Sequence, residues 1–117
     1  MFKIAKEFSF DMAHMLDGHD GKCQNLHGHN WIITVTLRSD KLTEYGMVMD
    51  FTHIKQKIHN RLDHQYLNEI FDFNPTAENI SKWIADELTG EFDGIYVECY
   101  EVIVEESPNN CAIWRVE

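Results

Sequence analysis

The chain has few cysteines, no long apolar run and few basic residues, and each shortage excludes a class of protein. Its three cysteines are an odd number without short spacing, which argues against a disulfide-stapled secreted domain and favours a reducing compartment. No apolar run approaches the roughly 20 residues of a membrane span. The first ten residues also lack the apolar block of a signal peptide. We therefore expect a cytoplasmic protein that does not bind membranes.

Basic residues are outnumbered: ten Lys and Arg stand against 20 Asp and Glu, for a formal net charge of −10. The basic residues form no run, so we expect no nucleic-acid partner. An anionic small molecule is still compatible with this balance, because a bound metal and backbone amides can set the local field. Residues 1–117 are expected to form a single domain, too small to enclose a deep pocket easily, which favours an active site shared between subunits.

Alternation of apolar and polar residues predicts two strands in the N-terminal third. The first covers Phe2–His14 and carries His14 on its apolar side. The second is clearest over residues 31–37, and the same parity extends backward to His29 and His27. Two adjacent strands would therefore bring His14, His27 and His29 to one point.

Two helices and two more strands are predicted in the rest of the chain. Asp50 is the expected N-cap of a helix over residues 51–62, and Thr76 that of a second helix, which Gly90 would end. β-branched and aromatic residues predict strands over residues 95–104 and 112–116. This order predicts an α+β domain in which a four-stranded antiparallel sheet carries both helices on one face.

The segment Cys23–His29 carries the donor types that zinc prefers, imidazole nitrogen and thiolate sulfur. Three inward histidines are costly to bury together without a metal, so His14, His27 and His29 are the predicted ligands. Cys23 has two functional interpretations. It is either a fourth ligand that closes a structural site or a thiolate beside an open three-histidine site.

The histidines of the first predicted helix differ in expected role. His53 and His59 occupy polar positions, where we expect contact with solvent. His64 follows Asp63 at the helix end, where a carboxylate can fix the tautomer of an imidazole for acid–base chemistry. Asp63 and His64 are therefore a candidate catalytic pair.

Together these motifs resemble the 6-pyruvoyl-tetrahydropterin synthase and 6-carboxy-tetrahydropterin synthase family over nearly the whole chain. The three residues between Cys23 and His27 are similar to the spacing in the bacterial 6-carboxy enzymes of the queuosine pathway, whereas the pyruvoyl-forming enzymes usually have a longer gap. The motifs that carry the resemblance are Ala13-His14, Cys23 with His27-Gly28-His29, Met49-Asp50-Phe51, Leu62-Asp63-His64, Pro75-Thr76-Ala77-Glu78-Asn79 and Glu106-Ser107.

The resemblance implies the tunnelling fold, in which two-helix, four-stranded subunits join by their sheet edges into trimers or hexamers with active sites between subunits. It also implies bound Zn²⁺ and a pterin triphosphate substrate. The matching site residues are the zinc ligands His14, His27 and His29, the catalytic residues Cys23, Asp63 and His64, and the pterin anchor Glu106.

The implied reaction is that of a zinc-dependent lyase in queuosine biosynthesis. It would convert 7,8-dihydroneopterin triphosphate to 6-carboxy-5,6,7,8-tetrahydropterin with release of triphosphate and acetaldehyde. Two alternatives stay open: formation of 6-pyruvoyl-tetrahydropterin by the same architecture, and a structural zinc module that Cys23 closes without catalysis. Glu105 is an alternative anchor, but Ser107 and strand parity favour Glu106.

Overall fold

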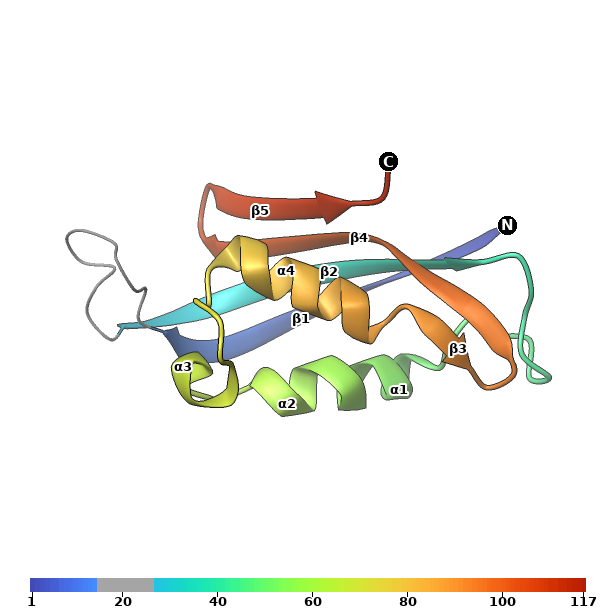
Figure 1. Ribbon diagram of the computed structural model, residues 1–117, viewed down its shortest axis with the longest axis horizontal. Coiled ribbons are helices and arrows are strands. Elements are labelled where there is room, and N and C mark those ends of the chain that lie inside the picture. Colours follow the sequence, from blue (N-terminus) through green and yellow to red (C-terminus); the bar gives the residue numbers. More distant parts are fainter. Residues whose placement is uncertain (15–26) are drawn as a thin grey trace.

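The computed structural model describes residues 1–14 and 27–117, and of residues 13, 14 and 27–29 it describes the backbone only. In this part of the chain an antiparallel sheet of five strands carries the helices on one face (Figure 1). The strand order is β1-β2-β4-β3, and β5 also pairs with β4. The α+β class is confirmed. The strands are β1 (Phe2–His14), β2 (His27–Ser39), β3 (Gly90–Phe92), β4 (Ile95–Ser107) and β5 (Asn110–Arg115).

Strands β1 and β2 form the framework of the sheet. Each has 13 residues, and they pair over their whole length, from Phe2 opposite Ser39 to His14 opposite His27. Their described side chains alternate as expected from Phe8 onward in β1 and from Trp31 onward in β2, where the even residues of β1 and the odd residues of β2 are buried. The buried members are Phe8, Phe10, Met12, Trp31, Ile33, Val35 and Leu37.

The helix predicted over residues 51–62 is present with one irregularity. Its segments are α1 (Phe51–Ile54), a π-helical turn η2 (Lys55–His59) and α2 (Asn60–Leu62). Asp50 is the N-cap, as predicted, since its Oδ1 accepts a hydrogen bond from the Thr52 N–H at 2.8 Å. The local signals therefore located both ends of this helix, while the π-helical turn was not foreseen.

The second predicted helix is α4 (Ala77–Glu87), which packs on β4 and β5. Thr76 caps it, because its Oγ1 accepts a hydrogen bond from the Asn79 N–H at 3.0 Å. The helix ends before Gly90, which instead begins β3. A short helix, α3 (Leu67–Ile70), lies between the two long ones and buries Leu67.

Strand β3 was not predicted, because residues 91–94 were expected to be a polar turn. It forms a hairpin with the start of β4 through Asp93 and Gly94, whose φ angles are +51° and +87°. Two consecutive positive φ angles are typical of the tight turn that suits the right-handed twist of a hairpin. The sheet therefore has one short strand more than the four expected.

The molecule is elongated, with principal extents of 50 × 27 × 25 Å. At one end, on the left of Figure 1, lie the end of β1, the start of β2, α3, the start of α4 and the β4–β5 turn. We call this the Asp63 end. At the opposite end lie α1 and the β3–β4 turn, and we call it the Asp93 end. No helix in the described ranges is long and apolar enough to cross a membrane.

Candidate active site

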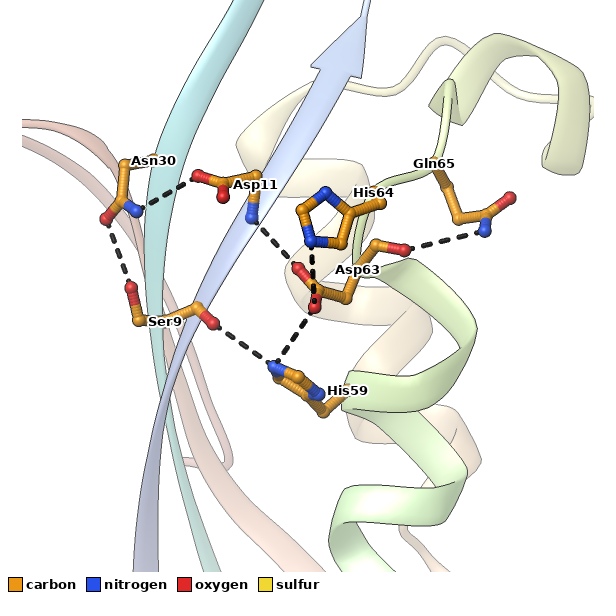
Figure 2. Close-up of polar contacts among 7 residues, drawn as sticks. All are labelled: Ser9, Asp11, Asn30, His59, Asp63, His64 and Gln65. Atoms are coloured by element: carbon orange, nitrogen blue, oxygen red, sulfur yellow. Dashed lines mark hydrogen bonds and ion pairs between the residues drawn. The ribbon is translucent and has the colours of Figure 1, made fainter.

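A carboxylate bound to the free edge of β1 is the centre of the candidate site (Figure 2). β1 is an outer strand, so backbone groups on one side have no partner within the sheet. The Asp11 N–H donates to Asp63 Oδ1 at 3.1 Å, and the Asp11 carbonyl accepts from the His64 N–H at 2.6 Å. The two residues that follow α2 are thus fixed to the strand by its main chain.

The predicted Asp63–His64 pair is present as a contact. His64 Nε2 lies 3.7 Å from Asp63 Oδ2, and the His64 side chain is 75% exposed. The backbone of His64 is left-handed, with φ of +58°, a conformation that costs free energy in a non-glycine residue and tends to occur at functional sites. The imidazole therefore has a fixed carboxylate on one side and open space on the other.

Polar side chains on the outer face of the sheet support this edge. Asn30 Nδ2 donates to Asp11 Oδ1 at 3.1 Å, and Ser9 Oγ donates to Asn30 Oδ1 at 3.1 Å. Gln65 Nε2 donates to the Asp63 carbonyl oxygen at 3.4 Å (Figure 2). Sequence reasoning treated Ser9, Asp11 and Asn30 only as the polar half of an alternation, because their partners come from another strand or from the helix end.

His59 lies beside Asp63 in this candidate site, and sequence reasoning did not include it. It was expected to face solvent, but its side chain is only 21% exposed, and its ring centroid lies 4.8 Å from that of Phe10. The π-helical turn η2 ends at His59, and the ring lies between the helix and β1 (Figure 2). The sequence did contain a signal for this contact. Asp63 is four positions after His59, and residues with this separation are neighbours on a helix.

The predicted zinc ligands occupy adjacent positions of the β1–β2 register. His14 lies opposite His27, and His29 lies opposite Met12. Directly opposite residues of an antiparallel pair have Cβ atoms about 4.5–5.5 Å apart, and diagonal neighbours are about 7–8 Å apart. These separations suit three imidazoles that share one zinc ion, so the donor set fits the metal.

Cys23 lies outside the described residues, and the side chains of the three histidines do as well. Among the side chains that the structure does describe, no group of three or more His, Cys, Asp or Glu residues is arranged to hold a metal ion. The zinc site and the role of Cys23 therefore stay predictions.

Glu106 lies at an irregularity of the sheet. Glu105 pairs in register with Cys111, and Ser107 pairs with Asn110, so the register shifts at Glu106. Such a bulge turns one side chain away from the regular ladder and often lies next to an active site. Glu106 lines a pocket of about 330 Å³ at the start of α4, together with Ala77, Glu78 and the first residues of β5.

A larger pocket, of about 790 Å³, lies at the Asp93 end. Its lining includes Tyr45, Asp50, His53 and Asp93. His53 Nδ1 lies 3.5 Å from Asp93 Oδ2, and both side chains are about half exposed. Sequence reasoning assigned no chemistry to this end, and His53 faces solvent as expected.

Comparison with known proteins gives a consistent result. A family model described as 6-pyruvoyl tetrahydropterin synthase matches residues 3–117. The chain is 50% identical over 102 residues to 6-carboxy-5,6,7,8-tetrahydropterin synthase of Haemophilus influenzae, covering 81% of this chain and 70% of that protein. It is 45% identical over 97 residues to the Synechocystis protein of the same name, covering 75% of each. A structure of Caenorhabditis elegans 6-pyruvoyl tetrahydropterin synthase has a TM-score of 0.73 at 26% identity, covering 99% of this chain and 96% of that one.

Proposed function

The chain belongs to the 6-pyruvoyl tetrahydropterin synthase family, and from this premise we propose that it is a zinc-dependent lyase that forms 6-carboxy-5,6,7,8-tetrahydropterin. Its substrate would be 7,8-dihydroneopterin triphosphate, and triphosphate and acetaldehyde would be released. The names of the Haemophilus influenzae and Synechocystis relatives support this product. We place the reaction in queuosine biosynthesis and in the cytoplasm.

One observation carries the proposal: the Asp63–His64 pair is attached to β1 at Asp11, three residues before His14 on the same strand. Three residues of a strand span about 10 Å. An acid–base pair and a predicted metal ligand therefore share one end of one strand, and the open side of His64 leaves room for a substrate.

His14, His27 and His29 would hold the zinc. When bound, the metal supplies a Lewis acid that polarises the hydroxyl groups of the substrate side chain. Cys23, as a thiolate, would take a proton from the substrate side chain. It is free for this role if the three histidines are sufficient as zinc ligands.

His64 would exchange protons on the other side of the substrate, with its ring oriented by Asp63. Glu106 would accept paired hydrogen bonds from the amino group and a ring N–H of the pterin, a charge-assisted bidentate contact. Its position at the bulge, facing a pocket, supports this assignment over Glu105.

Product analysis tests the proposal. Loss of triphosphate gives one carbonyl group, and transfer of two hydrogens from the remaining side-chain alcohol to the dihydropterin ring gives a second beside it and the tetrahydropterin. Water can then split the bond between the two carbonyl groups into a ring carboxyl group and acetaldehyde. We expect zinc-loaded protein to release acetaldehyde and triphosphate in equal amounts from 7,8-dihydroneopterin triphosphate. Triphosphate with 6-pyruvoyl-tetrahydropterin and no acetaldehyde would favour the alternative product, in line with the C. elegans neighbour. No turnover would contradict both.

The structural zinc module is tested by Cys23→Ala. If Cys23 is a base, the variant keeps its zinc and loses turnover. Loss of zinc together with activity would instead identify Cys23 as a fourth ligand. Metal content by mass spectrometry and a product assay on the same preparation separate the two results.

We further propose a homo-oligomer, a trimer or a hexamer, whose active sites lie between subunits. β1 forms one edge of the described sheet, β3 and β5 form the other, and Ile113 on β5 is exposed, which supports assembly through strand edges. Light scattering coupled to size-exclusion chromatography should give a mass that is a multiple of three chains. A monomer would contradict this.

A further inference from the structure

Asp63 has a second imidazole neighbour, and we propose that His59 is a positioning residue that holds the Asp63 carboxylate in place for His64. The inference rests on the proposed function, because it assigns a role within the same acid–base pair. His59 would act through Asp63 and would not touch the substrate.

The two imidazoles approach the same oxygen from different sides (Figure 2). His59 Nε2 lies 3.7 Å from Asp63 Oδ2, as does His64 Nε2. The His59 side chain is mostly buried, whereas that of His64 is mostly exposed. Asp63 Oδ2 therefore lies between a ring that is enclosed by protein and a ring that is open to solvent.

The surroundings of His59 fix which of its nitrogens carries hydrogen. Nε2 lies 3.2 Å from the Ser9 carbonyl oxygen, which can only accept a hydrogen bond, so Nε2 must be the donor. Nδ1 is fully buried and has no partner among the described residues. A hydrogen on Nδ1 would thus be a buried donor without an acceptor, which costs free energy. The N–H of His59 therefore points to the Ser9 carbonyl oxygen, and the same edge of the ring lies 3.7 Å from Asp63 Oδ2.

The ring of His59 has little freedom to move. Its centroid lies 4.8 Å from that of Phe10 and 5.8 Å from that of Phe8, and the π-helical turn η2 ends at this residue. Turns of this kind are rare and are frequently found at functional sites. A ring that cannot move keeps its Nε2 edge beside Asp63 Oδ2 and limits where the carboxylate can turn.

These contacts place one protein group beside each oxygen of the Asp63 carboxylate. Oδ1 accepts a hydrogen bond from the Asp11 N–H, and Oδ2 lies 3.7 Å from Nε2 of His59 on the buried side. Without His59 the Asp63 carboxylate keeps its hydrogen bond to the Asp11 N–H and can turn about it. The imidazole of His64 then loses a carboxylate of fixed orientation. The expected effect is on the proton-transfer step, because His59 is not among the residues that line the Glu106 pocket.

Substitutions of His59 test the proposal. His59→Phe keeps an aromatic ring against Phe10 but removes the N–H, and His59→Gln keeps an N–H donor. We expect His59→Phe to lower kcat by about 10- to 100-fold, since small misplacements of catalytic groups cost this much. KM should stay unchanged, and His59→Gln should recover most of kcat. The matched controls, His53→Phe and His53→Gln, lie on the same helix and should leave both constants unchanged.

A readout that is independent of turnover separates this proposal from the proposed function. Hydrogen exchange at the Asp11 amide reports whether Asp63 is in place, because that amide donates to Asp63 Oδ1. Exchange should be faster in His59→Phe than in wild-type protein and His59→Gln. If wild-type protein makes no product, the proposed function fails and the exchange result alone decides the role of His59. Unchanged exchange in His59→Phe, or a His59→Gln variant as slow in turnover as His59→Phe, would overturn the proposal.

Discussion

Each end of the molecule has an imidazole–carboxylate contact, and the two differ in what holds the carboxylate. Asp63 is 26% exposed and accepts a hydrogen bond from the backbone of β1. Asp93 is 55% exposed, lies in the β3–β4 turn and faces His53 at 3.5 Å. Exposed ion pairs contribute only about 0–1 kcal/mol and hold no fixed geometry. The difference is that the main chain anchors the carboxylate at the Asp63 end, and this anchoring is why we propose that end, and not the Asp93 end, as the catalytic one.

Pocket volume alone would favour the Asp93 end as the binding site. The Asp93 end has a cavity of about 790 Å³, while the pocket beside Glu106 measures about 330 Å³. A small domain has difficulty enclosing a deep site within one copy. Cavity size in a single chain is therefore a weaker guide here than the fixed position of groups that can transfer protons.

The largest expected effect is that of Asp63→Asn. It removes the charge that orients His64, and general acid–base catalysis typically contributes about 10²- to 10⁴-fold, so turnover measured by triphosphate release should fall by that range. Asp93→Asn is the matched control and should keep full activity. Equal losses in the two variants would remove the distinction between the ends.

Glu106→Gln should have the next largest effect, and it acts on KM. A hydrogen bond to a charged group contributes about 1.5–3 kcal/mol, which corresponds to an increase in KM of about 10- to 100-fold. Glu105→Gln keeps its place in the β4–β5 ladder and should change KM little. A larger effect at Glu105 would make that residue the pterin anchor.

Removal of either helix cap should have a smaller effect, and the two caps differ in their distance from the Glu106 pocket. Thr76→Ala and Asp50→Ala each remove a cap, and each should lower the free energy of unfolding by about 1 kcal/mol in urea titrations. Only Thr76 precedes the part of α4 that lines the Glu106 pocket. Thr76→Ala should therefore also raise KM, and a matching rise in Asp50→Ala would argue against the Asp63 end as the binding site.

The smallest effect concerns the thiols. Burial raises the pKa of the Cys99 thiol to about 12, so the reactive thiolate is almost absent at pH 8 and appears only as the pH approaches that value. Cys111 is exposed and lines the Glu106 pocket. Alkylation at pH 8, followed by peptide mapping, should modify Cys111 and leave Cys99 unmodified, and bound neopterin should slow the reaction at Cys111. Modification of Cys99 in folded protein would contradict this description of the core.

Local signals predicted most of the fold. Alternation located β1 and β2, and the side chains of Asp50 and Thr76 marked the starts of both long helices, because each signal depends on residues close in the sequence. The hairpin of β3 and β4 was missed although Asp93-Gly94 is a strong turn signal. Three residues are too few to show alternation, so β3 had no pattern of its own.

The candidate site was only partly predictable. The Asp63–His64 contact followed from adjacency in the sequence, but the hydrogen bonds to Asp11 depend on where the helix end meets the edge of β1. His59 was assigned to solvent because it occupies a polar position in a regular helical pattern, and that pattern does not show the π-helical turn that ends at His59 or the ring contact with Phe10. Cys23 lies outside the described residues, and its role stays a prediction.

The central claim is that the pterin binds at the Asp63 end, and a crystal structure of the zinc-loaded protein with neopterin tests it most directly. The account predicts the pterin ring against Glu106, in the pocket at the start of α4, with its side chain directed toward zinc held by His14, His27 and His29. Neopterin bound instead in the larger pocket beside Tyr45 and His53 would contradict it.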